Sequence, residues 1–455
     1  MRAWPSRWWL LVVGVLVAVL GLVAAVTILV VPTPDPAAPV GAGAVARPVP
    51  TRTPLLADPG DGAPLPSAAG LARALAPALA DPALGGAVAL SVVDATTRQV
   101  LLERSAATGA VPASTIKIAT AVAALSVLPV DSRFTTRVVA GSRPGEVVLV
   151  GGGDPLLAGK HPLRGYPGAA RLADLAAVLL KAGVPVRRVL VDDSLFAGPR
   201  LGPGWKAGYV GGGDVAPVSA LSVDGGRAAR GEHAARVADP ALEAGRQLAG
   251  LLGVQTPVTR TVAAPGAAPL ATVRSPPVAQ VVEAMLGRSD NDVAESFGRH
   301  IALARGLPAT FDGEAQAVAD VVSALVGPGG RPVLRDTSGL SPLDRVAPAA
   351  LTRLLATAAP DARFGPLLSG LPIAGFDGTL TKRYRSGPAA AAAGLVRAKT
   401  GTLSGVGALA GFVRTRGGRL LAFDLTANGV PANGTTAAQG ALDRVAAVLA
   451  GCGCQ

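Results

Sequence analysis

The sequence predicts an α+β fold in which one five-stranded antiparallel sheet is flanked by helices. Two regions far apart in the chain carry this prediction. An early hairpin is indicated by "GAVALSVVDA" (86–95) and "QVLLER" (99–104) around the turn "TTR". Three further strands lie at 394–403, 407–415 and 419–427. Helical segments come before, between and after the strands, so the order is not the βαβ alternation of a parallel sheet.

The first element is a transmembrane helix or signal segment, predicted over residues 8–31. Arg2 and Arg7 precede an apolar run of 24 residues, which is long enough to cross a bilayer. Basic residues on the short leading side place residues 1–7 in the cytoplasm. We expect a single-pass protein of the cell membrane whose remaining residues lie outside the cytoplasm. Cleavage near "GAGA" (41–44) is the alternative, and it would give a secreted protein.

The chain after this segment divides into a linker and two predicted domains. Residues 32–67 are rich in Pro, Ala and Gly, and we expect an extended linker there. Folded structure is expected to begin near Ser67 with the helix "AAGLARALAPALAD". A first domain is assigned to 68–130 and 268–455, and a second domain, inserted into it, to 131–267. The inserted part shows short strands, Gly/Pro turns and one clear helix at 169–183.

Two helices are predicted directly after the insertion, and one ends the chain. The first begins at a Ser-Pro cap in "SPPVAQVVEAMLG", and a second spans 292–304. The final helix is expected from 435 to 449. Apolar residues at helical spacing define the buried face of the first helix: Val278, Val281, Val282, Met285 and Leu286.

The composition excludes several classes of function. The net charge is +12, but no basic patch interleaved with aromatic residues is present, so a nucleic-acid partner is not expected. The three histidines are scattered without metal-binding spacing, and we predict neither a metal site nor a cofactor. The two cysteines, Cys452 and Cys454, could bridge each other or stay free.

Lysine is scarce in this chain, which draws attention to each one. Of 42 basic residues only six are lysines, at 117, 160, 181, 206, 382 and 399. Lysine can lose its proton in a protein, whereas arginine effectively cannot. Ser114 and Lys117 are one helical turn apart at a helix start marked by Pro112. A serine nucleophile needs a base, and burial together with a second cation such as Lys399 would lower the pKa of Lys117 toward that role.

Two further motifs complete a recognisable set. "SDN" at 289–291 falls between two helices, where such residues are also ordinary caps. "KTG" at 399–401 lies on a strand, where a lysine could equally be solvated. Each motif alone is weak. In the order S-x-x-K, S-D-N, K-T-G, they form the signature of active-site serine enzymes that act on penicillin-like or D-Ala-D-Ala substrates.

On these motifs the chain resembles the class C low-molecular-mass penicillin-binding proteins, which are D-alanyl-D-alanine carboxypeptidases and DD-endopeptidases. Further matching stretches are "VLVGGGDPLL" (148–157), "APVSALSVDGG" (216–226) and "DTSGLSPLDRV" (336–346). The resemblance covers about residues 70 to 450. It implies a beta-lactamase/DD-peptidase-like sheet with a second domain inserted between the first and second catalytic motifs. One departure is Thr337, which replaces a glycine of the family's usual D-G-S-G-L-S.

The resemblance also implies roles for the motif residues. Ser114 would attack the carbonyl of the D-Ala-D-Ala bond and Lys117 would take its proton. Ser289 would relay a proton to the leaving group. Asn291 would bind the substrate's amide backbone and help to hold Lys117. Lys399 would supply positive potential.

The third motif is further expected to bind substrate. Thr400, Gly401 and Thr402 would form that part of the site, with both threonines bonded to the terminal carboxylate. The backbone N–H groups of Ser114 and Thr402 would form the oxyanion hole. Expected partners are peptidoglycan stem peptides ending in D-Ala-D-Ala, beta-lactams as covalent inhibitors, and the membrane through the N-terminal helix.

Two rival functions remain open from the sequence. A class A beta-lactamase uses the same motifs, but such enzymes lack a large insert, and no E-x-x-L-N stretch follows Asn291. A catalytically inactive wall-binding protein is the second rival, against which the presence of all the motif residues argues. The sequence leaves open whether carboxypeptidase or endopeptidase action dominates.

Overall fold

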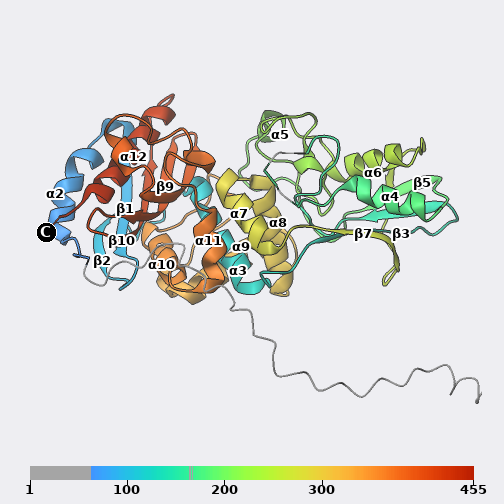
Figure 1. Ribbon diagram of the computed structural model, residues 1–455, viewed down its shortest axis with the longest axis horizontal. Coiled ribbons are helices and arrows are strands. Elements are labelled where there is room, and N and C mark those ends of the chain that lie inside the picture. The colour runs from blue at the N-terminus through green and yellow to red at the C-terminus, as the bar shows by residue number, and fades with distance from the viewer. Residues whose placement is uncertain (1–62, 163–164, 167, 455) are drawn as a thin grey trace, which may run out of the picture. The chain divides into compact units, whose positions relative to one another are not determined.

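The computed structural model describes residues 63–162, 165–166 and 168–454 (Figure 1). The predicted membrane segment at 8–31 and most of the predicted linker lie outside these residues. Within the described ranges, no helix is both long enough and apolar enough to cross a membrane. The first described helix begins at Ala68, directly after the N-cap Ser67, where folded structure was expected to start.

The first sheet contains the five predicted strands, all antiparallel. Its spatial order is β2-β1-β10-β9-β8, so the early hairpin pairs with the last strand of the chain. β8, which carries the third motif, is an edge strand. The strand bounds are Ala87–Asp94 (β1), Val100–Arg104 (β2), Val396–Leu403 (β8), Val406–Arg414 (β9) and Leu420–Asn428 (β10).

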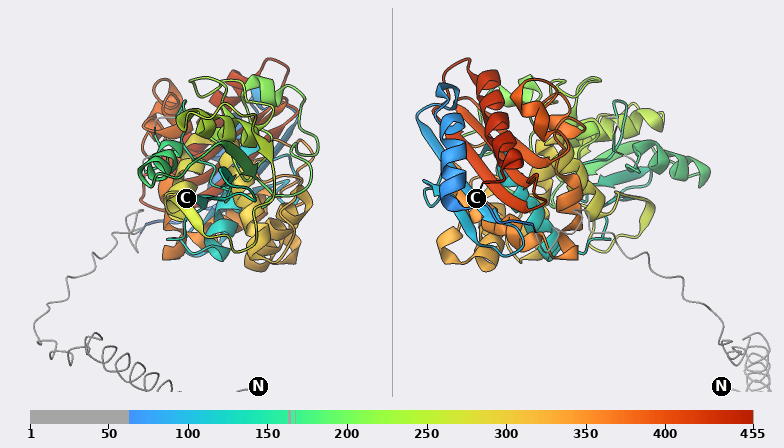
Figure 2. Two further views of the ribbon diagram at one scale, coloured as in Figure 1. Left: turned by 90° about the vertical axis from the view of Figure 1, so that its right-hand side faces the viewer. Right: turned by 60° about the vertical axis from the view of Figure 1, so that its left-hand side comes forward.

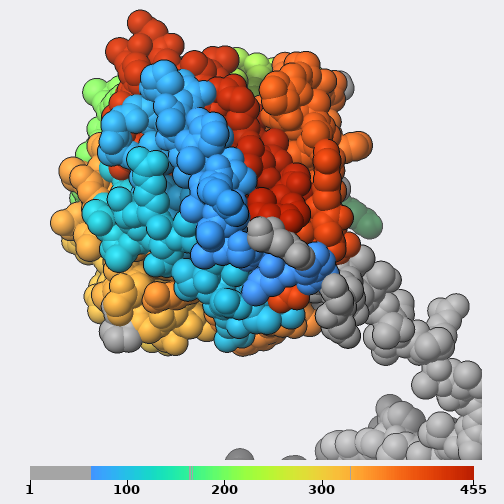
Figure 3. All heavy atoms as spheres, turned by 90° about the vertical axis from the view of Figure 1, so that its left-hand side faces the viewer, coloured from blue at the N-terminus to red at the C-terminus, as the bar shows by residue number. Residues whose placement is uncertain are grey.

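Helices cover both faces of this sheet. Alternate residues of each strand point to opposite faces, and both faces are apolar because both are buried. Leu409 and Phe423 pack with α2 (Ala68–Leu79) and α12 (Thr435–Gly451) on one face. Phe412 and Ala422 pack with α3 (Lys117–Val127) and α10 (Pro348–Ala358) on the other. Figure 3 shows α2 and α12 side by side at the molecular surface, although they lie at opposite ends of the described chain.

A group of helices continues the second face away from the sheet. α7 buries all five residues that its spacing assigned to one face, and they pack into the same core as α3. The predicted cap of α7 is wrong, because Ser275 Oγ accepts from the Phe134 N–H (2.9 Å) and Pro277 is the N-cap. The bounds are Val278–Arg288 (α7), Asn291–Ala304 (α8), Phe311–Val326 (α9) and Gly365–Gly370 (α11).

A second sheet lies in the region predicted as an insertion. Its order is β6-β5-β4-β3-β7; β4, β5 and β6 are parallel to one another, and β3 is antiparallel to β4 and β7. Figure 1 shows α7 and α8 between the two sheets, and Figure 2 gives two further views. The strand bounds are Thr135–Ala140 (β3), Glu146–Val150 (β4), Arg188–Asp192 (β5), Thr259–Arg260 (β6) and Pro269–Arg274 (β7).

This second region differs from its prediction in two respects. β7 extends the sheet past residue 267, the predicted end of the insertion. In addition to α4 (Leu172–Lys181), a second long helix, α6 (Pro240–Leu251), packs on the same core. The prediction of a single helix is therefore wrong. The signals for α6 are present, since Asp239 caps it by accepting from the Leu242 N–H and Pro240 occupies its first turn.

The remaining helices are short. α5 is a single turn at Tyr209–Gly212. The 3₁₀ turns are Pro82–Leu84 (η1), Ala113–Ile116 (η2), Asp224–Gly226 (η3), Pro328–Gly330 (η4), Ala362–Phe364 (η5), Gly378–Leu380 (η6) and Pro388–Ala392 (η7).

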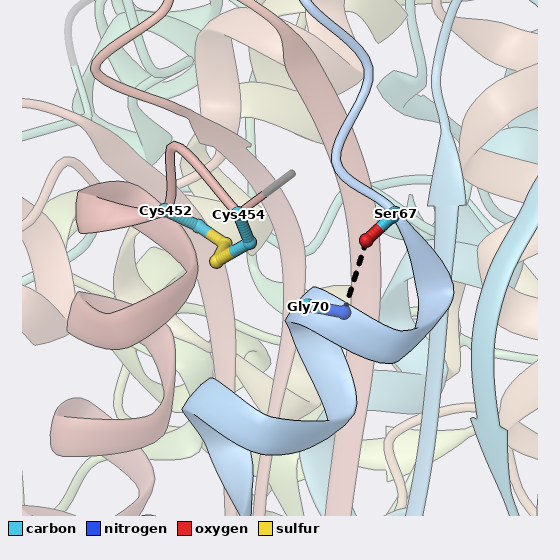
Figure 4. The surroundings of a disulfide bond; sticks show 4 residues. All are labelled: Ser67, Gly70, Cys452 and Cys454. Carbon is cyan, nitrogen blue, oxygen red and sulfur yellow. Dashed lines mark hydrogen bonds between the residues drawn. A yellow bond between two sulfur atoms is a disulfide. The ribbon is translucent and has the colours of Figure 1, made fainter.

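The C-terminal residues fold back onto the start of α2. Cys452 and Cys454 form a disulfide, which decides between the two alternatives left open by the sequence (Figure 4). The Ser67 N–H donates to the Cys454 carbonyl at 2.8 Å, and Ser67 Oγ accepts from the Gly70 N–H at 3.0 Å. The described chain thus has its first helix and its last residues joined at one place.

Candidate active site

The first motif lies in a tight turn that leads into α3. Ser114 is the second residue of η2 and is half-buried, so that its hydroxyl remains accessible. The preceding residue, Ala113, has φ 47°, in the left-handed region that disfavours a residue with a Cβ atom. Strain of this kind costs about 1–3 kcal/mol and is concentrated at functional sites. It sets the direction in which the chain enters the turn and presents Ser114.

Lys117 lies behind Ser114 with no solvent exposure. Its Nζ donates to Ser114 Oγ at 3.1 Å, to Asn291 Oδ1 at 2.7 Å and to the Ser338 carbonyl at 2.5 Å. A protonated lysine has three N–H donors, and here each has an acceptor. If the lysine loses one proton, the freed lone pair can point at the Ser114 hydroxyl.

The pKa of Lys117 is lowered to about 8, and burial is the cause. The charges of Asp336, Glu295, Asp290 and Asp292 act in the opposite direction and limit the fall. The predicted effect of burial is confirmed. Two cations at close range disfavour each other's charge, and the charge of Lys117 lowers the pKa of Lys399.

The second and third motifs supply another serine–lysine pair. Ser289 caps the C-terminus of α7 in the left-handed conformation, with φ 58°. Lys399 extends from the edge strand β8, is fully buried, and donates from Nζ to Ser289 Oγ at 2.8 Å and to the Thr400 carbonyl at 2.8 Å. Burial and the charge of Lys117 lower the pKa of Lys399 well below its usual range. Two residues 110 positions apart in the sequence are therefore in direct contact.

Asn291 begins α8 and joins the two halves of the site. Its Oδ1 accepts from Lys117, and its Nδ2 donates to the Asp214 carbonyl at 2.9 Å. The predicted hold on Lys117 is present in this geometry. A side-chain amide carries two N–H bonds, so the contact with Asp214 leaves the second one for another acceptor.

The strand that carries Thr400, Gly401 and Thr402 lies close against the nucleophile turn. A Cβ atom on Gly401 would lie 2.7 Å from the Pro112 carbonyl oxygen and 3.2 Å from Ala113 Cβ, closer than side chains normally pack. Glycine is therefore required for β8 and η2 to approach. Thr400 Oγ1 donates to Thr379 Oγ1 at 2.9 Å, and Thr402 Oγ1 accepts from Gln439 Nε2 at 3.4 Å.

The direction of the Thr402 N–H follows from the strand pairing. The Ala398 N–H donates to the Pro372 carbonyl, which lies on the side of β8 away from β9. Because backbone groups alternate in direction along a strand and the β8–β9 register is unbroken, the N–H of Thr402 points the same way. It is directed outward from the sheet edge, where the predicted oxyanion hole requires a donor.

The arrangement is two buried lysines, each bonded to a serine hydroxyl, and the comparison with known protein families decides its assignment. The sequence model of the D-Ala-D-Ala carboxypeptidase 3 (S13) family matches residues 71–234 and 227–449. The chain belongs to this family. The predicted activity class, serine-type D-Ala-D-Ala carboxypeptidase, is therefore confirmed, and so is its low-molecular-mass penicillin-binding-protein relationship.

Individual relatives of the S13 chain agree with this assignment. It is 41% identical to Carboxypeptidase DacB of Mycolicibacterium smegmatis, over 89% of this chain and 90% of the relative. It is also 41% identical to Carboxypeptidase Rv3627c of Mycobacterium tuberculosis, over 87% and 86%. The crystal structure of penicillin binding protein 4 from Haemophilus influenzae covers 84% of this chain and 98% of its own, with a TM-score of 0.68 at 22% identity. The predicted α+β, DD-peptidase-like fold is thereby confirmed.

A loop of the S13 chain that the sequence analysis quoted only for its resemblance contributes directly to the site. This loop, "DTSGLS" at 336–341, brings the Ser338 carbonyl to Lys117. Thr337, the departure from the family pattern, donates from Oγ1 to the Ala294 carbonyl at 3.0 Å. It occupies space that Gly298 leaves open, since a Cβ there would lie 2.5 Å from Thr337 Oγ1. The larger residue is accommodated by a glycine on the facing helix.

Residues from the second-sheet region, for which the sequence predicted no role, also support the motifs. Trp205 Nε1 donates to Asp336 Oδ2 at 2.7 Å. The Ala216 N–H donates to Asp292 Oδ1 at 2.7 Å, beside the second motif. The only signal for them in the sequence was the stretch 216–226, which matches the family. In the described part of the chain, no group of three His, Cys, Asp or Glu is placed to hold a metal ion.

Proposed function

We propose that this S13 family member cleaves the terminal D-Ala-D-Ala bond of peptidoglycan stem peptides through an acyl-enzyme on Ser114. The observation that supports it most strongly is the 3.1 Å contact between Ser114 Oγ and the fully buried Lys117 Nζ, set beside the Lys399–Ser289 pair. An inserted domain that begins at 131 and includes β7, and a membrane anchor at 8–31, belong to the same proposal.

Acylation begins with proton transfer from Ser114 to a neutral Lys117. With a pKa of about 8, about a tenth of Lys117 is neutral at pH 7. The serine oxygen attacks the scissile carbonyl carbon, and the negative charge that develops on the carbonyl oxygen is held by the N–H groups of Ser114 and Thr402. Loss of one such donor typically costs about 10²–10³ in rate.

The substrate's own carboxylate assists this step. Thr400 and Thr402 hold it beside Lys399, where its negative charge favours the protonated form of that lysine. A charged Lys399 then disfavours a charge on Lys117, so substrate binding shifts the shared proton toward Lys399 and leaves Lys117 able to act as a base.

Departure of D-alanine requires a proton on its nitrogen. Ser289, bonded to Lys399, donates from its hydroxyl to the leaving nitrogen and recovers a proton from Lys399. The proton that Lys117 took from Ser114 replaces the one that Lys399 gave, so Lys117 is neutral again. The acyl group remains as an ester on Ser114 Oγ. A water molecule then gives a proton to Lys117 and attacks the ester carbonyl, and Lys117 returns that proton to Ser114 as the shortened peptide leaves.

Beta-lactams are proposed as covalent inhibitors of the same serine. Penicillin binding protein 4 of Haemophilus influenzae has been crystallised with a beta-lactam, which supports the proposal because the fold is shared. The strained lactam carbonyl would take the position of the D-Ala-D-Ala carbonyl. Endopeptidase action on peptidoglycan crosslinks is a second candidate for this site.

The location outside the cytoplasm is supported by two observations. One is the apolar run at 8–31 preceded by arginines, and the other is the Cys452–Cys454 disulfide, since disulfides persist in oxidising compartments. Cell fractionation with external protease tests this: we expect the chain in the membrane fraction and digested in spheroplasts. Recovery in the cytosolic fraction would contradict it.

The function is tested by comparing the full chain with Ser114→Ala and with Ser126→Ala. Ser126 lies on α3, and its Oγ donates to the Val122 carbonyl within the helix, so its substitution is a matched control. We expect wild type and Ser126→Ala to bind fluorescent penicillin covalently and release D-Ala from a stem peptide. Ser114→Ala should do neither.

Product analysis separates the rival functions. Rapid turnover of nitrocefin without D-Ala release would identify a beta-lactamase instead, and failure of wild type to bind penicillin would identify an inactive wall-binding protein. Mass spectrometry of products from intact cell wall distinguishes carboxypeptidase from endopeptidase cleavage.

A further inference from the structure

The carbonyl that holds Lys117 is itself fixed by a buried acid. Glu295, on α8, has 1% exposure, and its Oε1 accepts from the Ser338 N–H at 2.8 Å and the Thr337 N–H at 3.3 Å. The same peptide segment presents the Ser338 carbonyl to Lys117 Nζ at 2.5 Å. Glu295 is thus one residue removed from the proposed base, and it reaches Lys117 through the backbone of the 336–341 loop.

The second carboxyl oxygen of Glu295 faces another acid. Glu314, on α9, has no exposure, and no described N–H or O–H donor reaches Glu295 Oε2 or either Glu314 oxygen with hydrogen-bond geometry. Arg299 Nε lies 3.4 Å from Glu314 Oε2. A proton carried by Glu314 can bridge to Glu295 Oε2, which gives that oxygen a donor and leaves Glu295 as the charged partner.

We propose that Glu295 is a positioning residue for Lys117: it fixes the Ser338 carbonyl that holds the ammonium, and its negative charge favours the protonated lysine. The inference rests on the proposed role of Lys117 as the base. It assigns to the buried Glu295–Glu314 pair the control of the pH at which that base becomes neutral.

The electrostatics of the surroundings determine the expected sign. Charged and titratable groups around Lys117 and the acid pair come from several elements: Lys399 on β8, Asp290, Asp292, Glu295 and Arg299 on α8 and its start, Glu314 on α9, and Asp336 in the loop. Burial, followed by the charge of Asp336, raises the pKa of Glu295 to about 7, and burial raises that of Glu314 well above its usual value. The charge of Glu295 raises the pKa of Lys117. Removing it should let Lys117 become neutral at lower pH.

The test measures the rate of acylation by fluorescent penicillin against pH in the full-length protein. Glu295→Gln keeps an oxygen acceptor for the two N–H groups but carries no charge. We expect the acid limb of its profile to shift to lower pH by about one unit, with the plateau at high pH within about twofold of wild type. Glu295→Ala removes the acceptor as well, and its plateau should fall about tenfold.

Two further variants keep the proposal falsifiable. Glu314→Gln replaces a protonated acid by an amide that can make the same donation to Glu295, so it should keep the wild-type acid limb. Asp424→Asn is the matched control for a buried acid, because burial also raises the pKa of Asp424 to about 7, but its side chain contacts Thr426 on β10. It should keep both limb and plateau.

The outcomes separate the inference from the proposed function. If the acid limb of Glu295→Gln coincides with those of wild type and Glu314→Gln, the charge of Glu295 does not control the pKa of Lys117. If Glu295→Ala reaches the same plateau rate as wild type, Glu295 does not position Lys117. If Glu295→Gln does not fold, Glu314→Gln still tests the proposal. A shift of its acid limb to lower pH would show that the charge is not carried by Glu295. Failure of wild type to acylate at any pH would instead overturn the function itself.

Discussion

The two serine–lysine pairs are equally buried but have opposite electrostatic surroundings. Lys117 donates to three acceptors and has four carboxyl groups near enough to raise its pKa. Lys399 donates to Ser289 and to a backbone carbonyl, and the charge that acts on it is that of Lys117. Burial lowers the pKa of both lysines, but neighbouring carboxyl groups counteract this decrease in pKa only at Lys117.

The difference shows how a single proton is placed between two like groups. Two cations confined at close range in a buried site cannot both keep their protons. The acidic residues behind Lys117 favour its protonated form, whereas burial and the charge of Lys117 disfavour the protonated form of Lys399. A carboxylate that arrives at Lys399 reverses the preference. We therefore expect a substrate with a terminal carboxylate to increase the fraction of neutral Lys117 when it binds.

The largest expected effect comes from removing the ability of Lys117 to become neutral. Lys117→Arg keeps a positive charge, but a guanidinium stays protonated and cannot accept the Ser114 proton. General-base catalysis is worth about 10²–10⁴ in rate, so we expect penicillin acylation to fall about 10³-fold. Stopped-flow labelling measures it.

Lys206→Arg is the control for this exchange. Lys206 is another of the six lysines, and its Nζ donates to Ser404 Oγ at 2.6 Å on the surface. Its substitution should change the acylation rate by less than about fivefold. Unchanged acylation in Lys117→Arg would show that another group takes the serine proton and would remove the distinction between the two pairs.

A smaller effect is expected from Lys399. Lys399→Met fills the same buried space without a charge, so the carboxylate of the substrate loses its positively charged partner. We expect the rate of acylation to fall about 10²-fold. Stability should move in the opposite direction. The pKa of Lys399 is depressed in the folded state, so the unfolded chain binds more protons than the folded one. The stability of wild type therefore rises with pH until the pH reaches the pKa of an unfolded lysine, near 10.4.

Thermal melting against pH tests the stability half of this prediction. Lys399→Met should melt at a higher temperature than wild type at pH 7, and the gap should narrow toward pH 10. If Lys399→Met melts at a lower temperature than wild type at every pH, the buried charge of Lys399 does not destabilise the protein. The two lysines would then be electrostatically alike.

Local patterns predicted the strands of the first sheet and the pairing of Ser114 with Lys117, and the family resemblance implied the contact of Asn291 with Lys117, whereas longer connections were not predictable. The hairpins β1–β2 and β9–β10 are joined by short turns, so each strand and its pairing partner can be predicted from one short stretch of sequence. In the second region, β5 and β6 join their parallel neighbours through long connections, and the two-residue β6 offers no periodicity. Glu295, Ser338 and Asp214 were missed because each acts through contacts with residues that are remote in sequence. Ser338 and Asp214 contribute through backbone groups, which any residue type carries.

Gly401 sets the spacing between the two pairs, and its substitution should have the smallest of these effects. A Cβ on Gly401 would press on the Pro112 carbonyl at 2.7 Å, so Gly401→Ala must move β8, and with it Lys399, away from the turn that carries Ser114. Small displacements of catalytic groups cost up to about 10²-fold, and we expect about a tenfold loss of acylation. Gly407→Ala on the neighbouring strand is the control, since its Cβ would meet the end of a flexible leucine at 3.3 Å. If the two variants acylate equally fast, the separation of the pairs is not what sets the rate, and their coupling must act through charge alone.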